Sequence, residues 1–334
     1  MMRTKRHLAK VSVVIPAFNE AGNLPKLLMN ILEVLEASEN YEVIFVDDGS
    51  SDETLDVLKT LHDMNENVHF VSLSRNFGHQ YALKAGLDHA TGDCVISMDA
   101  DLQHPPALIP EMIAKWRQGY DVVNTHRNAN GNLSFFKRTT SSLFYRTINV
   151  LSPVKIEEGA ADFRLIDRAV ADVLKRSVER DPFFRGLIPW MGFRTYTLNY
   201  DLTPRFSGKT KYSPKKMFLF AANGITSFST RPLQFATILG ACISMLAFLY
   251  GLTAIYSYIQ GNVVPGWTSV LASVLFIGGL QLLILGIIGG YLGKLFNQSK
   301  HRPLYIVRER DSGLDEASAL SSALAEFSDD RVAV

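Results

Sequence analysis

The chain has 334 residues, of which 47% are hydrophobic, and its formal net charge is +1. This length allows one large domain or two, and the near-neutral charge gives no global nucleic-acid footprint, so we expect no nucleic-acid partner. The two cysteines, Cys94 and Cys242, lack the spacing of a metal site and are expected to pack in apolar surroundings.

The N-terminal part of the chain alternates short apolar runs with amphipathic segments. Strands are predicted over residues 11–16, 43–46, 68–71, 94–98 and 121–124, and helices over residues 23–35, 54–61, 81–89 and 106–117. This alternation specifies an α/β fold with a mostly parallel sheet and helices on both faces. Residues 128–212 are less regular, with helices predicted over 135–150, 170–174 and part of 182–191, and a strand over 192–200.

A long uncharged stretch follows, because residues 232–293 contain no Asp, Glu, Lys or Arg. Residues 233–259 and 268–296 each exceed the roughly 20 residues that cross a bilayer, so two C-terminal transmembrane helices are predicted, with a turn at 261–266. An uncharged core of a soluble domain is the alternative. Residues 214–231 begin with lysines and are rich in Phe, which favours a helix in the membrane interface over an ordinary core helix.

The charges that flank the two predicted spans indicate their orientation. The loop between the spans has no Lys or Arg, whereas Arg231 precedes the first span and Lys294, Lys300 and Arg302 follow the second. Cytoplasmic loops carry the excess of Lys and Arg. We therefore expect a multi-pass protein of the inner (plasma) membrane, with the α/β domain and both termini cytoplasmic.

These patterns divide the chain into four parts. We expect an α/β domain over residues 1–212, interface helices over 213–231, two transmembrane helices over 232–298 and a cytoplasmic tail over 299–334. The tail is acidic and rich in Ser and Ala, and it is interpreted as mobile from about residue 311.

Two carboxylates, Asp99 and Asp101, follow the apolar run of residues 95–98. Residues i and i+2 of a strand lie on one side, so both carboxylates can face one ion. Mg²⁺ and related ions take carboxylate oxygens together with substrate phosphates, which implies a substrate with a diphosphate. Ligands of open α/β sheets also bind at the carboxyl ends of strands. The alternative is that this Asp-x-Asp arose by chance and caps a loop or helix.

Five motifs occur in order along the chain: residues 14–20 (VIPAFNE), 46–50 (VDDGS), 99–103 (DADLQ), 161–165 (ADFRL) and 205–212 (RFSGKTKY). The ordered set resembles the family 2 glycosyltransferases, which have the GT-A (Rossmann-like) fold. More closely, it resembles the polyprenyl-phosphate glycosyltransferases, which include bactoprenol glucosyltransferases and dolichol-phosphate mannose synthases. The resemblance covers roughly residues 10–305, and the two predicted spans match the bactoprenol type better than the soluble mannose synthases.

The resemblance implies a nucleotide site made by Pro16, Phe18, Glu20, Val46 and Asp48, together with Asp99, Ala100 and Asp101. The chemistry of the residues agrees, because carboxylates that follow neighbouring strands can accept hydrogen bonds from a base N–H or from ribose hydroxyls. A turn and a helix cap at Ser51 or Asp52 is the other interpretation of residues 47–52, and both can hold.

The resemblance also implies a metal site and a catalytic carboxylate. Asp99, Asp101 and Gln103 would hold a divalent cation, Mg²⁺ or Mn²⁺, and Asp162 would be the catalytic residue. A lipid phosphate has a second pKa of about 6, so the acceptor is largely a dianion already and needs little help from a base. We therefore expect Asp162 to orient the acceptor or to take a residual proton. A structural pair with Arg164 or Arg168 is the alternative.

Four cationic residues match phosphate-binding positions of the family: Arg127, Arg138, Arg205 and Lys211. Arginine binds phosphate in a bidentate way, and a loop that carries cations can close over a diphosphate. A solvated surface position is the alternative for any one of them. Residues 75–79 (RNFGH) match another stretch of the family and are assigned a structural role near the site, whereas His79 is assigned no role.

The resulting prediction is an enzyme, a membrane hexosyltransferase that moves glucose from UDP-glucose onto undecaprenyl phosphate with inversion. The expected partners are the nucleotide-sugar donor, the polyprenyl phosphate acceptor, the membrane, and a flippase and a second glycosyltransferase downstream; a homo-oligomer is left open. The alternatives are another donor (GDP-mannose or a UDP-amino-sugar) and a non-catalytic membrane scaffold. A processive polysaccharide synthase is disfavoured because the Gln-x-x-Arg-Trp motif is absent.

Overall fold

The structure, a computed structural model, describes residues 9–35, 40–127, 160–177, 179–180, 182–200, 231–260, 266–311 and 313–314. The chain divides into two compact units. The first unit joins residues 1–145 and 156–211 with residues 303–334, so the chain leaves this unit and later returns to it. The second unit holds residues 146–155 and 212–302.

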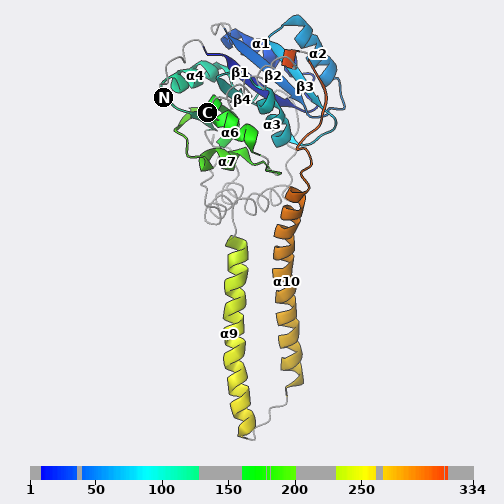
Figure 1. The fold of residues 1–334 in the computed structure, drawn as a ribbon, viewed down its shortest axis with the longest axis vertical. Helices are drawn as coiled ribbons and strands as arrows, with labels where there is room; N and C mark the ends of the chain where they lie inside the picture. The colour runs from blue at the N-terminus through cyan, green and yellow to red at the C-terminus, as the bar shows by residue number, and fades with distance from the viewer. Residues whose placement is uncertain are drawn as a thin grey trace, which may run out of the picture. The chain divides into compact units, whose positions relative to one another are not determined.

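Among the described residues of the first unit, eight strands form one sheet in the order β7-β5-β6-β4-β1-β2-β3-β8. Strands β1 to β4 of this sheet are labelled in Figure 1. The pairs β1–β2, β1–β4, β2–β3 and β5–β7 are parallel, and β6 and β8 pair antiparallel to their neighbours. The bounds of the strands are β1 Val11–Ala17, β2 Tyr41–Asp47, β3 Val68–Leu73, β4 Cys94–Ser97, β5 Val122–Arg127, β6 Ala160–Asp167, β7 Thr195–Tyr200 and β8 Val307–Arg310.

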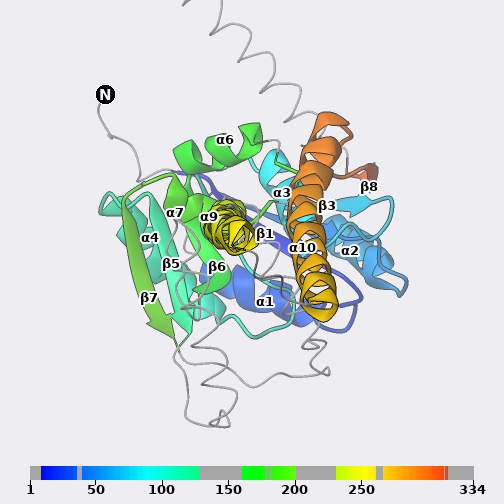
Figure 2. The same cartoon turned by 90° about the horizontal axis from the view of Figure 1, so that it is seen from below.

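Helices cover both faces of this sheet, as Figure 2 shows, with α3 and α6 on one face and α1 and α4 on the other. The bounds are α1 Leu24–Leu35, α2 Thr54–Met64, α3 His79–His89, α4 Ile109–Arg117, α6 Arg168–Arg176 and α7 Phe184–Trp190, and the short helical turn η1, Pro106–Leu108, leads into α4. The predicted α/β class, mostly parallel with helices on both faces, is confirmed.

The central strands are buried on both sides, which is why they read as continuous apolar runs in the sequence. Helix α3 lies very close to β1 at Gly86, where a Cβ atom would come within 2.2 Å of Val14 Cγ1. On the opposite face, α1 buries the apolar stripe that its sequence period predicted. The sheet therefore supports the loops at the two ends of its strands.

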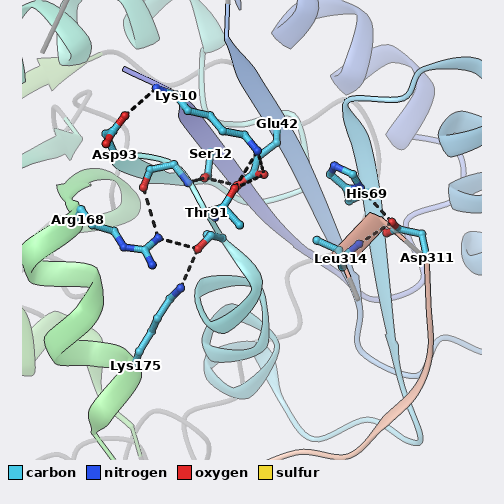
Figure 3. A network of polar contacts seen from close by, with 12 residues as sticks. Lys10, Ser12, Glu42, His69, Thr91, Asp93, Arg168, Lys175, Asp311 and Leu314 are labelled. Carbon is cyan, nitrogen blue, oxygen red and sulfur yellow. Dashed lines mark hydrogen bonds and ion pairs between the residues drawn. The ribbon is translucent and has the colours of Figure 1, made fainter. Parts of the chain in front are cut away.

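A polar network around the buried Glu42 joins the amino ends of β1 and β2, and we call it the amino-end network (Figure 3). Its members are Lys10, Ser12, Glu42 and Thr91. The Glu42 carboxylate accepts hydrogen bonds from the Ser12 hydroxyl and from the Thr91 N–H and hydroxyl, and it pairs with Lys10 Nζ. Burial opposes the charge of Glu42, yet Lys10, Ser12 and Thr91 outweigh it and lower the pKa of Glu42.

Strand β8 fills the edge of the sheet beside β3 with residues that follow the second predicted span. Just after β8, the buried Asp311 accepts hydrogen bonds from the Phe70 N–H (2.9 Å) and the Leu314 N–H (3.3 Å) and contacts His69 Nδ1 at 3.0 Å (Figure 3). His69 and Phe70 belong to β3, so this carboxylate fastens the returning segment to the sheet. Sequence analysis predicted no strand in this segment.

The second unit contains two long helices among its described residues, α9 (Arg231–Ile259) and α10 (Trp267–Ser299). The stretches Leu233–Tyr250 and Phe276–Ser299 are long and apolar enough to cross a membrane by length and composition. Almost none of their residues is buried, which disfavours the alternative of a soluble core helix. The interface helices predicted over 213–231 lie outside the described residues except for Arg231, the first residue of α9.

Most predicted elements are present within one to three residues of their expected bounds, and one further strand was missed. Strand β6 carries Asp162 and Arg164, whose side chains are buried together. Charged residues at buried positions hide the apolar pattern that marks a strand, so β6 was not predicted. The predicted helix over residues 135–150 lies outside the described residues.

Candidate active site

The loops that carry the predicted site residues open at one side of the sheet, which we call the carboxyl edge. Strands β1, β2, β3 and β4 run parallel, so their carboxyl ends lie together. Strand β6 runs the other way and places Arg164 opposite Ser97. Asp162 therefore lies beyond the end of β4, beside the loop that begins at Met98.

The loop after β2 is built around Asp48. Its two carboxylate oxygens accept hydrogen bonds from the backbone N–H groups of Phe77 (2.7 Å) and Gly78 (2.9 Å). Burial raises the pKa of Asp48 despite these two donors, and the neighbouring Asp47 adds to the rise. A buried carboxylate at a strand end can still accept a hydrogen bond on its remaining lone pairs.

Gly49 allows the two loops to meet. Its φ of +66° lies in the left-handed region, and a Cβ atom there would come within 2.3 Å of the Arg75 carbonyl carbon. A side chain at this position would push residues 75–78 away from Asp48. The predicted turn at residues 47–50 is therefore present, and it also positions the loop after β3.

The other predicted nucleoside residues surround this loop. Pro16 and Val46 are buried register partners on β1 and β2. Phe18, which follows β1, is 37% exposed at the carboxyl edge. Glu20 accepts a hydrogen bond from Asn23 Nδ2 at 2.6 Å and donates its backbone N–H to Thr54 Oγ1. The structure thus brings all five predicted nucleoside residues to the ends of two adjacent strands.

Asp99 lies beside His104, and one of its carboxylate oxygens has no hydrogen-bond partner among the described residues. Its N–H donates to His104 Nδ1 at 3.0 Å, and Nε2 of the same ring lies 3.7 Å from Asp99 Oδ2. His104 is buried and stacks on Phe163, with ring centroids 5.2 Å apart. Asp99 Oδ1 is buried and has no hydrogen-bond partner among the described residues.

The rest of the DADLQ motif forms a tight turn at the same place. Asp101 Oδ1 accepts a hydrogen bond from the Gln103 N–H at 3.1 Å, and Ala100 is buried. Leu102 has a φ of +61°, a conformation that a branched residue adopts only when its surroundings enforce it. The donor set of Asp99, Asp101 and Gln103 is all oxygen, which fits a hard divalent cation.

Asp162 is held between two arginines. Arg185 donates Nε to Asp162 Oδ1 at 3.0 Å and Nη2 to Oδ2 at 2.8 Å, and Arg164 Nη2 donates to Oδ1 at 3.2 Å. Burial alone would raise the pKa of Asp162, but Arg185, His79 and Arg164 hold it well below its ordinary value. Asp162 is therefore a fixed negative charge. The predicted alternative pair with Arg164 exists, whereas Arg168 instead bonds the Ala90 carbonyl and pairs with Asp172.

His79 bridges the two acidic groups. Its Nε2 lies 3.5 Å from Asp99 Oδ1 and 3.5 Å from Asp162 Oδ2, and its side chain is 41% exposed. Burial lowers the pKa of the His79 imidazole, but the carboxylates of Asp162 and Asp99 more than offset this and raise it. His79 begins α3 directly after Phe77 and Gly78, whose N–H groups bind Asp48. Residues 77–79 therefore connect the Asp48 carboxylate to Asp99 and Asp162, which we call the acidic pair.

Sequence reasoning assigned no role to His79 and did not find Arg185 or His104. Only the RNFGH match pointed towards His79, and Arg185 joins the site because α7 places it beside β6. Of the predicted phosphate-binding residues, Arg127 ends β5 but its side chain lies outside the described residues. Arg138, Arg205 and Lys211 also lie outside them.

Comparison with known proteins identifies the family of the chain. The family model of glycosyl transferase family 2 matches residues 12–174, from β1 to α6. An uncharacterized glycosyltransferase of Synechocystis sp. is 44% identical over 302 residues, 90% of this chain and 95% of the relative. The chain belongs to glycosyl transferase family 2, so the predicted enzyme class, a hexosyltransferase, is confirmed.

More specific names occur among the relatives. The bactoprenol glucosyl transferase of Shigella phage SfV is 40% identical over 301 residues, 90% of this chain and 98% of the relative. The prophage bactoprenol glucosyl transferase homolog of Escherichia coli has the same identity and coverage. Among solved structures, a mannosyltransferase of Pyrobaculum calidifontis in complex with GDP-Man and Mn²⁺ has a TM-score of 0.45 and 19% identity, covering 76% of this chain and 83% of that one, a likeness too distant to support an argument.

Proposed function

We propose that this protein transfers a hexose, glucose from UDP-glucose, onto a membrane polyprenyl phosphate with inversion at the anomeric carbon. The observation that carries the proposal is the carboxyl edge, where Asp99 Oδ1 lies buried without a hydrogen-bond partner among the described residues, beside the fixed charge of Asp162. The relatives named bactoprenol glucosyl transferase, 40% identical over 90% of this chain, support the lipid acceptor and the glucosyl donor.

The oxygen atoms at the DADLQ turn favour a divalent metal ion. Asp99, Asp101 and Gln103 supply oxygen ligands on one tight turn, and the orphaned Asp99 Oδ1 fits a cation ligand better than a structural hydrogen bond. A Mg²⁺ or Mn²⁺ ion held there would neutralise the negative charge that grows on the departing diphosphate. Phe18, Glu20 and Asp48 would bind the nucleoside at the adjacent strand ends.

In the reaction, an oxygen of the acceptor phosphate forms a bond to the anomeric carbon as the bond to the diphosphate breaks. One such displacement inverts the anomeric configuration. The acceptor is largely a dianion at neutral pH, because its second pKa is about 6, so no proton must be removed. The depressed pKa of Asp162 makes it a poor base, and its bidentate contact with Arg185 supports an orienting role.

The membrane role is supported by α9 and α10, whose apolar stretches could each cross a bilayer. Lys and Arg lie at the start of α9 and at the end of α10, and they are absent from residues 260–266 between the two helices. Both termini and the catalytic unit would therefore be cytoplasmic. In a Cys242→Ser background, Asn262→Cys should react with a membrane-impermeant maleimide on intact cells. Lys300→Cys should react only after lysis, and the opposite result would reverse the orientation.

The test of function is a transfer assay with the purified full chain in detergent. Undecaprenyl phosphate is mixed with Mg²⁺ or Mn²⁺ and labelled UDP-glucose, GDP-mannose or a UDP-amino-sugar, and the lipid product is extracted. We expect a lipid-linked hexose from UDP-glucose, and none after addition of a chelator. For variants of the site carboxylates, such as Asp99→Ala, the matched control is Asp63→Asn on the exposed surface of α2.

The other outcomes of this assay separate the alternatives. Product from another donor would keep the mechanism and change the sugar. Nucleotide binding without product from any donor would point to a different acceptor, and the absence of metal-dependent nucleotide binding would favour a non-catalytic scaffold. The lipid-linked sugar would then be substrate for a flippase and a second glycosyltransferase.

A further inference from the structure

A polar cavity of about 170 Å³ lies in the first unit next to the loop after β3. Three segments line it: the loop after β3 with the first turn of α3, the loop between α6 and α7, and the segment between α10 and β8. The lining residues are Arg75, Phe77, Tyr81, Arg180, Pro303 and Leu304. Among the described residues, the lining includes two cations and no Asp or Glu.

Internal contacts fix the walls of this cavity. The Arg75 guanidinium lies over the Phe77 ring, 4.0 Å from its centroid, and Nη1 donates to the Asn76 carbonyl at 3.1 Å. This carbonyl uses one of the five N–H donors of Arg75. The Tyr81 hydroxyl donates to the Arg180 carbonyl, which fastens the loop between α6 and α7 to α3.

The chemistry of the lining selects an anion. Arginine is the side chain that best matches the oxygens of a phosphate, and stacking on an aromatic ring orients its planar group in advance. At roughly 30 Å³ for each water, the cavity has room for about five waters, which is sufficient for the five heavy atoms of a phosphate group. We propose that this cavity, the Arg75–Arg180 pocket, binds the phosphate group of a membrane lipid.

The position of the pocket along the chain favours a lipid over a soluble phosphate. Pro303 lies four residues after Ser299, where α10 ends. Four residues of chain therefore join this wall of the pocket to the end of a candidate membrane helix. Lipid phosphates occupy the interfacial layer that flanks the hydrocarbon core. This step rests on the membrane attachment proposed above.

The pocket also shares a loop with the candidate donor site. The N–H groups of Phe77 and Gly78 donate to Asp48, while the Phe77 ring lines the pocket. The next residue along the chain, His79, contacts the acidic pair. A lipid phosphate bound by Arg75 would therefore lie against the loop that organises the nucleotide side of the carboxyl edge.

Two sources could supply this phosphate: the polyprenyl phosphate acceptor and the anionic phospholipids of the bilayer. The experiment uses the purified full chain in a neutral detergent without any nucleotide sugar. Farnesyl phosphate and short-chain phosphatidylglycerol are titrated separately, with farnesol as the control for the apolar tail. Binding is measured by calorimetry for the natural sequence, Arg75→Gln and Arg180→Gln. Arg176→Gln, an exposed arginine near the same loop that does not line the pocket, is the matched control.

A hydrogen bond to a charged group is worth about tenfold in affinity, so each pocket variant should weaken binding about tenfold and Arg176→Gln less than about twofold. Loss confined to farnesyl phosphate would identify the acceptor as the ligand, and equal loss for both lipids would identify a general lipid phosphate site. Unchanged binding in both pocket variants, with an unchanged melting temperature, would overturn the proposal.

The two proposals can fail separately. Binding is measured without a donor, so a pocket that binds lipid phosphate in a protein that transfers no sugar would contradict only the proposed function. If Arg180→Gln does not fold, Arg75→Gln still tests the pocket, because Arg75 is exposed and its hydrogen bond and ring contact are with Asn76 and Phe77 of its own loop.

Discussion

Two buried carboxylates, Glu42 and Asp162, lie towards opposite edges of the same sheet, and each has a lowered pKa. Glu42 belongs to the amino-end network, where its partners are Ser12 of β1, Lys10 just before β1 and Thr91 before β4 (Figure 3). Asp162 is paired with two arginines and contacts His79, which is 41% exposed. The partners of Glu42 lie at or just before the amino ends of the strands, whereas Asp162 shares His79 with the buried Asp99 Oδ1, which has no hydrogen-bond partner among the described residues.

Unsatisfied atoms make the same distinction. Among the described residues, the buried side-chain atoms without a hydrogen-bond partner are Asp99 Oδ1 and Asn124 Oδ1. Asp99 follows β4 and Asn124 lies on β5, so both flank β6, which carries Asp162. Buried polar atoms are normally satisfied, and exceptions concentrate at functional sites. We therefore expect mutations at the amino-end network to change stability and mutations at the carboxyl edge to change activity.

The largest effect is expected from removing the acidic pair of the DADLQ motif. Asp99→Ala or Asp101→Ala should reduce transfer at least about 10³-fold and weaken nucleotide binding, because the charge on the diphosphate loses its counter-ion. The melting temperature of Asp99→Ala should change little, since Asp99 Oδ1 has no hydrogen bond to lose, whereas Asp101→Ala also loses the hydrogen bond from the Gln103 N–H. Initial rates and nucleotide titrations measure the effect, and unchanged turnover would remove the metal hypothesis.

The next effect should fall on stability alone. Glu42→Gln replaces a buried carboxylate that accepts three hydrogen bonds and pairs with the one-third-exposed Lys10, which should lower the free energy of unfolding by about 3 kcal/mol. Thermal unfolding in detergent measures the shift, with the exposed Glu53→Gln as control. Nucleotide affinity per folded molecule should stay the same, and a selective loss of affinity would break the comparison between the two edges.

Asp162→Asn should have an intermediate effect on activity. Loss of the charge should slow transfer about 100-fold, because Arg185 and Arg164 lose the group that positions them. Nucleotide affinity should stay nearly intact. The pKa of Asp162 lies well below the ordinary value of 3.8, so Asp162 stays charged at pH 4 and above. It should therefore add no acid limb to the pH–rate profile above about pH 4. Asp172→Asn, on the surface, is the control. Failure of Asp162→Asn to fold would support the structural interpretation of Asp162.

The smallest effect concerns Lys175, which donates to the Ala90 carbonyl at 2.7 Å. Burial, with a contribution from Arg168, lowers the pKa of Lys175 from 10.5 to about 8. The unfolded chain therefore binds more protons above pH 8, and stability should rise with pH there. We expect a rise of about 1 kcal/mol between pH 8 and 9.5 after allowance for solvent screening. Lys175→Met should remove this slope in unfolding curves, and an equal slope in both proteins would contradict the assignment.

The sequence predicted the parallel part of the sheet because buried strands such as β1 and β2 are continuous apolar runs. It predicted Asp48, Asp99 and Asp162 because they lie directly in short motifs. It missed β8, since Arg308 and Arg310 give this edge strand the composition of a polar tail. Arg185 and His104 could not be found, because their roles depend on how α7 and the turn before η1 pack against β6 and β4.

The return of the chain at β8 has a consequence for the order of folding. The open edge of β3 is covered only by residues that the ribosome adds after both long helices, more than 200 positions later. At 5–20 residues per second, this edge waits roughly 10 to 50 s for its partner strand during synthesis. An unpaired edge is a template for association with other chains. The catalytic sheet is therefore completed after α10 has been made, and a protein truncated at Ser299 would retain an adhesive edge.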